Sequence, residues 1–235
     1  GLLKRSLVAG AGAVALTTVG GTSSIGRQYF SFAVRQAEAA QLNTDLDVLN
    51  YALTLEYLEA DAYKAINDAG ILSGRASTYF RAFGGHEMEH VNAITATIQQ
   101  LGGTPVSKPA FDFSGVPSDP MEVVKFFQTV EAVGASAYRG AAPSIQNHDV
   151  LTAALQIHAN EAEHAAALAD LVAPGTNLFS PDAFGAERTP AQVLEIVGPW
   201  LPSGTGGGMP GMPATGAGGT ATRTQFGGGL RSNLK

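Results

Sequence analysis

The chain has 235 residues, of which 14% are charged and none is cysteine, and its formal net charge is −6. The lack of cysteine excludes disulfides, thiolate metal sites and cysteine nucleophiles. Residues 41–200 carry a net charge of −12, whereas residues 1–40 and 201–235 each carry +3. An acidic centre argues against nucleic-acid binding and favours the attraction of cations. The sparse charge leads us to expect a homo-oligomer or a subunit of a larger assembly, because a typical domain has about 25% charged residues.

Residues 1–40 have the plan of an export signal or anchoring arm. Lys4 and Arg5 precede a weakly apolar run, residues 7–20, and resemble a twin-arginine signal whose first Arg is replaced by Lys. The run is too short for a confident membrane-spanning helix, which needs about 20 mainly apolar residues. We expect an exported protein, periplasmic or associated with the cell envelope, that could contact a membrane through residues 1–21.

Four stretches with helical periodicity follow within residues 41–173, which we interpret as one bundle domain. Capping residues and glycines predict their limits, with Thr44 or Asn43 at the first start and Gly70 at the first end. Residues 102–119 are rich in Gly, Pro and Ser and predict a long crossover between two helix pairs. The expected helices span residues 44–69, 73–101, 120–141 and 144–172.

Two further segments complete the chain. Residues 174–202 form a helical extension, in which Thr189-Pro190 begins a short helix that runs to about Leu201. Residues 203–235 contain 11 glycines and show neither helical nor strand periodicity. We interpret this last segment as a Gly-rich tail.

Six residues interrupt the apolar faces of the four predicted helices in a repeating order, Glu … Glu-x-x-His … Glu … Glu-x-x-His. A Glu and a His three residues apart lie on the same face of a helix. Two such pairs, with one Glu from each of two other helices, make the ligand set of a carboxylate-bridged two-metal site. Four carboxylates balance two divalent cations, whereas each would cost several kcal/mol if buried alone. The six are Glu56, Glu87, His90, Glu131, Glu161 and His164.

The two halves of the bundle also form an internal repeat. A shift of 75 residues aligns Glu56 with Glu131 and Tyr63 with Tyr138, and a shift of 74 aligns the two Glu-x-x-His motifs. We expect two helix hairpins related by a near-twofold axis, each giving half of the metal site. Tyr63 and Tyr138 would then lie beside the metals as redox-active or hydrogen-bonding neighbours, and aromatic core packing is the alternative.

Some acidic and histidine residues allow other interpretations. His86-Glu87-x-x-His90 matches the zinc metalloprotease pattern, but that pattern leaves the second Glu-x-x-His motif unexplained. On our interpretation His86 is a neighbour of a ligand or a surface residue. Glu59, one turn after Glu56, could replace it as a ligand.

The remaining candidates lie close to the second motif or beside the ligands. His158 is one turn before Glu161 and could add a ligand or a proton relay, although a surface histidine is the simpler interpretation. Glu89 and Glu163 lie two residues from the predicted ligands, so we expect them to point into solvent.

The motifs ALTLEYLEADAY, GGHEMEH and ALQIHANEAEHAAAL resemble the ferritin-like superfamily, which includes ferritin, bacterioferritin, rubrerythrin and manganese catalase. With the export-like start, the chain more closely resembles bacterial ferritin-like-domain proteins related to desiccation-related proteins. The resemblance covers about residues 42–172. It implies an all-α ferritin-like four-helix bundle in which the six residues bind two iron ions or, alternatively, two manganese ions. It leaves open which glutamates bridge the metals.

Two functions follow as hypotheses. The first is a di-metal oxidoreductase, similar to a ferroxidase, a peroxidase or a manganese catalase, that uses O₂ or peroxide. The second is a structural or interaction subunit of an envelope or surface assembly, in which the bundle is a scaffold and the metal is structural or absent.

Overall fold

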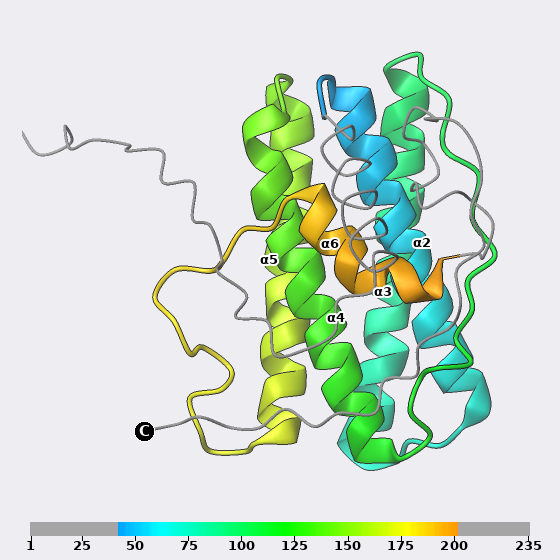
Figure 1. Cartoon of the computed structure of the whole chain (residues 1–235), viewed down its shortest axis with the longest axis vertical. Coiled ribbons are helices and arrows are strands. Elements are labelled where there is room, and N and C mark those ends of the chain that lie inside the picture. Colours follow the sequence, from blue (N-terminus) through cyan, green and yellow to red (C-terminus); the bar gives the residue numbers. More distant parts are fainter. Residues whose placement is uncertain (1–41, 202–235) are drawn as a thin grey trace, which may run out of the picture.

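The computed structural model describes residues 42–201 and shows a bundle of four long helices (Figure 1). A 3₁₀ turn, Ala142–Ser144, precedes the last of the four, and a short helix, α6 (Pro190–Val197), with a second 3₁₀ turn, Gly198–Trp200, follows the bundle. Within residues 42–201 there is no strand, so the all-α fold is confirmed. The bundle helices are α2 (Asp45–Ala69), α3 (Gly74–Gln100), α4 (Pro120–Ala141) and α5 (His148–Val172).

Capping side chains set most helix ends where the sequence predicts them. Thr44 and Asp47 form a capping box at the start of α2, each side chain accepting a hydrogen bond from the other residue's backbone N–H. Gly70 ends α2 with φ 64°, a left-handed conformation that glycine adopts without steric cost. At the start of α4, the Asp119 carboxylate accepts hydrogen bonds from two backbone N–H groups.

The start of the fourth bundle helix differs from the prediction. The expected start at residue 144 is wrong, because α5 begins at His148. Pro143 lies in the 3₁₀ turn that ends α4, and the Asn147 side chain then caps α5 by accepting hydrogen bonds from the backbone N–H groups of Asp149 and Val150.

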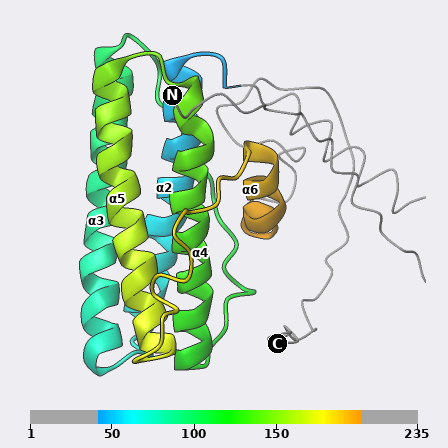
Figure 2. The ribbon, with the colours of Figure 1, turned by 90° about the vertical axis from the view of Figure 1, so that its left-hand side faces the viewer.

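Two helix hairpins, α2–α3 and α4–α5, pack side by side, and α6 covers one face of the bundle (Figure 2). Residues 102–119 contain no helix and run along the bundle from the end of α3 to the start of α4 (Figure 1). Val193 and Val197 of α6 join a buried apolar cluster with Tyr51 and Leu55 of α2 and Val133 of α4. The α3 and α5 helices therefore lie on the side of the bundle away from α6.

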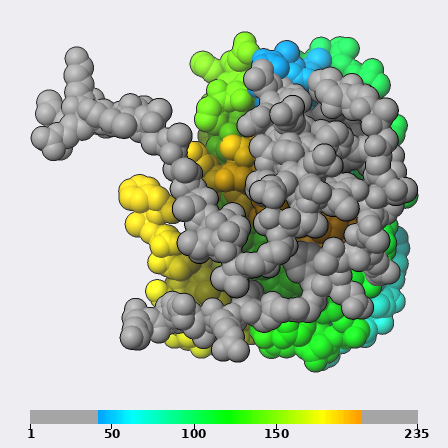
Figure 3. Space-filling model, in the orientation of Figure 1, coloured from blue at the N-terminus to red at the C-terminus, as the bar shows by residue number. Residues whose placement is uncertain are grey.

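Residues 173–189 link α5 to α6 at the edge of the molecule (Figure 3). This segment holds the most exposed large apolar side chain of residues 42–201, Phe184, with 91% exposure. None of the helices in residues 42–201 is long and apolar enough to cross a membrane. The predicted arm, residues 1–40, and the Gly-rich tail, residues 203–235, lie outside the described residues, and the division into these segments stays a prediction.

Candidate metal centre

Each of the four bundle helices places a fully buried glutamate on its inward-facing stripe. A buried apolar residue lies one turn before each of these positions, such as Leu53 before Glu56 and Phe83 before Glu87. Amphipathic burial of each helix therefore carries its carboxylate into the centre of the bundle. The four glutamates have no exposed surface, His164 is 1% exposed and the side chain of His90 is 12% exposed. These are Glu56 on α2, Glu87 on α3, Glu131 on α4 and Glu161 on α5.

All six predicted residues come together in two overlapping groups. Within each group, one ligand atom from every residue lies within 4.8 Å of the others. One group has Glu56 and His90 and the other has Glu131 and His164, while Glu87 and Glu161 belong to both. The glutamates of the two Glu-x-x-His motifs thus lie at the centre, and the single glutamates lie on opposite sides of it.

Both histidines direct Nδ1 toward the carboxylates. His90 Nδ1 lies 3.0 Å from Glu87 Oε2, 3.1 Å from Glu56 Oε2 and 3.4 Å from Glu161 Oε1. His164 Nδ1 lies 3.0 Å from Glu87 Oε1 and 3.2 Å from Glu131 Oε2. Each imidazole therefore has a nitrogen among the oxygens that a metal would bind.

Two tyrosines hold the single glutamates in a crossed arrangement. Tyr138 of α4 donates a hydrogen bond from its hydroxyl to Glu56 Oε1 of α2. Tyr63 of α2 donates in the same way to Glu131 Oε1 of α4. The hydrogen-bonding role expected for these tyrosines therefore has a structural basis, while a redox role stays a prediction.

Burial and mutual repulsion favour protons on this cluster. Burial raises the pKa of Glu161 well above its ordinary value, and the charges of Glu87, Glu131 and Glu56 raise it further. Burial also raises the pKa of Glu87, to about 7. For the histidines burial lowers the pKa, but hydrogen bonds to the surrounding carboxylates outweigh it and raise the pKa of His90 to about 12 and that of His164 to about 9. When no metal is bound, these shifts favour protons on the carboxylates and imidazoles of the cluster.

The donor set fits two divalent cations. Within residues 42–201, Glu161 Oε2 has no hydrogen-bond partner and Oε1 has only the long contact with His90 Nδ1, at 3.4 Å, although both oxygens are buried. A buried carboxylate with so few partners is costly, and a cation would satisfy both of its oxygens. Four carboxylates and two imidazoles suit iron, manganese and other divalent first-row metals. The residues are therefore able to hold a metal pair.

A fifth buried carboxylate, Glu59, lies beside the two groups but belongs to neither. Glu59 is 3% exposed, and burial raises its pKa well above the ordinary value, as does the charge of Glu161. A Cβ atom on Gly134 of α4 would lie 2.9 Å from Glu59 Oε1 and 2.7 Å from Glu161 Oε2. Glycine at this position therefore makes room for both carboxylates.

The internal repeat shows how the bundle accommodates Glu59, a buried carboxylate that helical periodicity alone does not distinguish from Glu56. The shift of 75 residues that aligns Glu56 with Glu131 also aligns Glu59 with Gly134. The extra acid in one half faces the glycine in the other. Since Glu56 supplies the carboxylate of its group, the alternative in which Glu59 replaces Glu56 is not favoured.

The other histidines lie outside both groups. His86 is exposed, and its Nδ1 lies 2.9 Å from Nε2 of His164, whose ring also stacks on Phe83. The residues described do not assemble the zinc metalloprotease pattern, because no metal-binding group contains His86. His158 pairs instead with Arg139, at 2.9 Å. As expected, Glu89 and Glu163 are exposed.

Comparison with known proteins agrees with this geometry. A family model described as a ferritin-like domain matches residues 44–174, which is more than half of the chain. The match includes all four bundle helices and all six candidate ligands, and it ends before α6. No curated protein matches the chain. The chain belongs to the ferritin-like domain family.

Proposed function

We propose that the chain binds two metal ions, iron in the first instance, and oxidises Fe(II) with O₂ or peroxide in an exported setting. One observation carries the proposal: two buried groups of three carboxylates and one imidazole share Glu87 and Glu161. Ligands shared between two groups are what a pair of bridged metals requires. The exported setting rests only on Lys4, Arg5 and the apolar run that follows them.

The geometry supports a distinct role for each ligand. Glu87 and Glu161 would help to hold both metals, because each belongs to both groups. Glu56 with His90 would complete one metal, and Glu131 with His164 the other. The Tyr138 and Tyr63 hydroxyls orient Glu56 and Glu131, and such outer hydrogen bonds fix both ligand geometry and metal affinity.

When bound, a pair of Fe(II) ions supplies two electrons, which with two protons convert O₂ to hydrogen peroxide or hydrogen peroxide to two waters. The chain supplies groups that hold protons close to this reaction. Glu59 is buried with its pKa raised, so it holds a proton beside Glu161. The Nδ1 of exposed His86 lies within hydrogen-bond distance of Nε2 of His164. A proton could therefore pass between solvent and the buried cluster through these two imidazoles.

Manganese is the alternative cofactor. The same carboxylate and imidazole donors accept Mn(II), and a manganese pair would convert two molecules of peroxide to O₂ and water. The manganese-loaded protein would then remove peroxide without consuming Fe(II). Peroxide removal by this form, in the absence of iron, separates the two alternatives.

Oxidation of Fe(II) by the anaerobically loaded protein tests the proposal. After addition of air-saturated buffer we expect Fe(III) absorbance to form faster than with free Fe(II), with one O₂ consumed per Fe(II) pair. Glu87→Gln should abolish this acceleration. Glu89→Gln is the matched control, because Glu89 lies on the same helix and is exposed. Equal rates in these two variants would contradict the proposal, and a protein that binds neither iron nor manganese would favour the scaffold hypothesis.

A further inference from the structure

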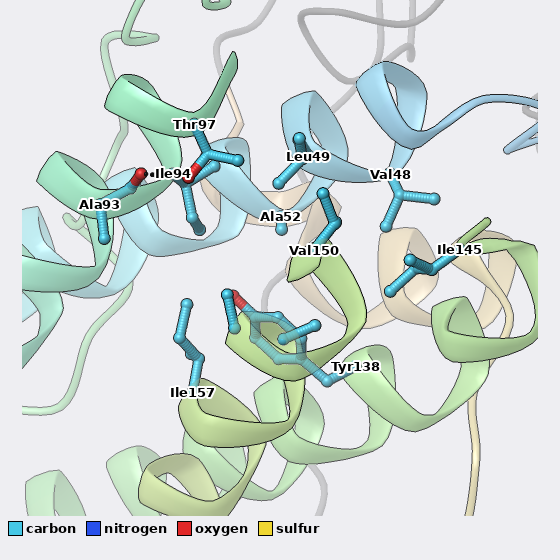
Figure 4. Close-up of a pocket in the computed structure, with 12 residues that line it drawn as sticks. Val48, Leu49, Ala52, Ala93, Ile94, Thr97, Tyr138, Ile145, Val150 and Ile157 are labelled. Carbon is cyan, nitrogen blue, oxygen red and sulfur yellow. Dashed lines mark hydrogen bonds between the residues drawn. The ribbon is translucent and has the colours of Figure 1, made fainter. Parts of the chain in front are cut away.

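A pocket of about 40 Å³ lies among the bundle helices, at the end where α2 begins and α3 ends (Figure 4). All four bundle helices contribute to its lining, which is almost entirely aliphatic. Of its lining residues, Ala93 of α3 is exposed and Ala154 of α5 is half-buried, so we infer that it opens between these two helices. Its inner wall includes buried Ala52, Ile94 and Ile157. The pocket therefore leads from the surface into the bundle.

The inner wall lies one helical turn from one of the two ligand groups. Ala52 precedes Glu56 by four residues, Ile94 follows His90 by four, and Ile157 precedes Glu161 by four. Four residues on a helix correspond to about 6 Å along its axis. Residues one turn away from three of the four ligands in the Glu56–His90 group thus line this pocket.

Tyr138 connects the pocket to the metal centre directly. Its ring lies among the side chains that line the space (Figure 4). Its hydroxyl donates a hydrogen bond to Glu56 Oε1. One side chain therefore contacts both the pocket and a ligand of the Glu56–His90 group.

The internal repeat shows why the pocket exists at this end of the bundle. At the equivalent end, Tyr63 packs against Phe127, Phe80 and Phe83, with ring centroids 4.5, 5.1 and 6.3 Å away. The shifts of 75 and 74 residues align these three phenylalanines with Ala52, Ala154 and Ile157, in that order. Aromatic rings fill the Tyr63 end, whereas smaller side chains leave space at the Tyr138 end.

The chemistry of the lining selects an apolar guest. A single water needs about 10–15 Å³ and two to four polar partners, so size alone would admit water or a diatomic molecule. Both hydroxyls in the lining already donate hydrogen bonds, Thr97 to the Ala93 carbonyl and Tyr138 to Glu56. Water and hydrogen peroxide would lose their own hydrogen bonds on entry, whereas O₂ has none to lose.

We propose that this pocket admits O₂ and holds it beside the Glu56–His90 side of the metal centre. The inference rests on the proposed function and deepens it by separating the two oxidants. O₂ reaches the metals through the apolar pocket, and hydrogen peroxide does not. Among residues 42–201, the Tyr63 side of the centre is packed instead with aromatic rings.

Xenon is an apolar atom without hydrogen bonds to lose, so its binding tests whether the pocket admits an apolar guest when no metal is present. Crystals of the metal-free full chain under xenon pressure should show xenon within the lining of wild type. Ala154→Phe places a phenylalanine at the position that the repeat aligns with Phe80, and this variant should exclude xenon. Ala159→Phe is the matched control, since Ala159 is exposed on the same helix, and this variant should retain xenon.

Stopped-flow mixing of the Fe(II)-loaded variants then tests the route. In Ala154→Phe we expect oxidation by O₂ to slow by about tenfold while oxidation by hydrogen peroxide and the metal content stay unchanged. Ala93→Trp, at the exposed mouth, is a second variant that leaves the core packing intact and should have the same effect. The proposal is overturned if wild type takes up no xenon, or if variants that exclude xenon react with O₂ at the wild-type rate. Wild type that is oxidised by peroxide but not by O₂ would overturn this inference alone, whereas no oxidation by either would overturn the proposed function.

Discussion

At the residue scale, Gly134 is the position on which the two neighbouring carboxylates Glu59 and Glu161 depend. A methyl group there would lie 2.7 Å from Glu161 Oε2, closer than van der Waals contact allows. We predict that Gly134→Ala displaces the Glu161 carboxylate and weakens binding of Mn(II) by about 10- to 100-fold, the usual effect of disturbing the groups that orient a metal ligand. Calorimetric titration of the metal-free protein with Mn(II) measures this.

A second glycine provides the control for that substitution. Gly85 lies on α3, and a Cβ atom there would meet nothing within 4 Å. Gly85→Ala should therefore leave Mn(II) affinity unchanged and stabilise the protein by about 0.5–1 kcal/mol, because alanine loses less backbone entropy in a helix. Equal Mn(II) affinity in the Gly134→Ala and Gly85→Ala variants would show that Glu161 is not held where the structure places it.

The protons on the metal-free centre predict how stability depends on pH. The folded pKa of Glu87 is raised from 4.5 to about 7 by burial, and that of His164 is raised from 6.5 to about 9 by Glu131 and Glu87 against the effect of burial. A group whose pKa is raised on folding stabilises the protein below its unfolded pKa and loses this effect as the pH passes its folded pKa. The metal-free protein should therefore lose stability between pH 4.5 and pH 9.

Bound metal should reverse this trend, because it binds deprotonated carboxylates and imidazoles and competes better with protons as the pH rises. Thermal unfolding across this pH range, with chelator and with Mn(II), measures both curves. We expect the midpoint to fall with pH in chelator and the difference between the two curves to widen. A metal-free midpoint that rises steadily over the same range would contradict the proton assignment for Glu87 and His164.

At the element scale, the N-terminal capping residues of α5 and α3 form a matched pair. The Asn147 side chain accepts hydrogen bonds from two backbone N–H groups of α5, whereas Ser73 at the start of α3 makes no side-chain capping hydrogen bond. We predict that Asn147→Ala costs about 1 kcal/mol, or about 2–4 °C in the unfolding midpoint, and that Ser73→Ala costs much less. Thermal unfolding of both variants under one condition measures the difference, and equal losses would refute the capping assignment.

Helix limits and the convergence of the six candidate ligands could be predicted from sequence because both depend on local signals. Thr44, Asp119 and Gly70 act within one turn, and an acid within an apolar stripe must be carried into the core. The start of α5 was missed because Pro143 continues α4 as a 3₁₀ turn, which periodicity does not show. The sharing of Glu87 and Glu161 depends on how the two hairpins sit against each other, and helix spacing does not contain that information.

At the scale of the whole molecule, the placement of α6 also lay beyond the sequence. An eight-residue amphipathic helix predicts that one side is buried but does not say against what. In the structure Val193 and Val197 pack on α2 and α4, so α6 covers the helices that carry the single glutamates, Glu56 and Glu131. The α3–α5 side is not covered by α6, and exposed Ala93 of the pocket lining lies on α3.

The metal content of the full chain, purified without chelator, tests the central claim most directly. Three proteins should be compared: wild type, Glu56→Ala with Glu131→Ala, and Glu89→Ala with Glu163→Ala. Both variants lose two carboxylates, but the first pair is buried among the ligands and the second is exposed. We predict about two iron or manganese ions per chain in wild type and in the exposed pair, and their loss in the buried pair. Wild type without metal, even after anaerobic loading with Fe(II) or Mn(II), would contradict the metal centre.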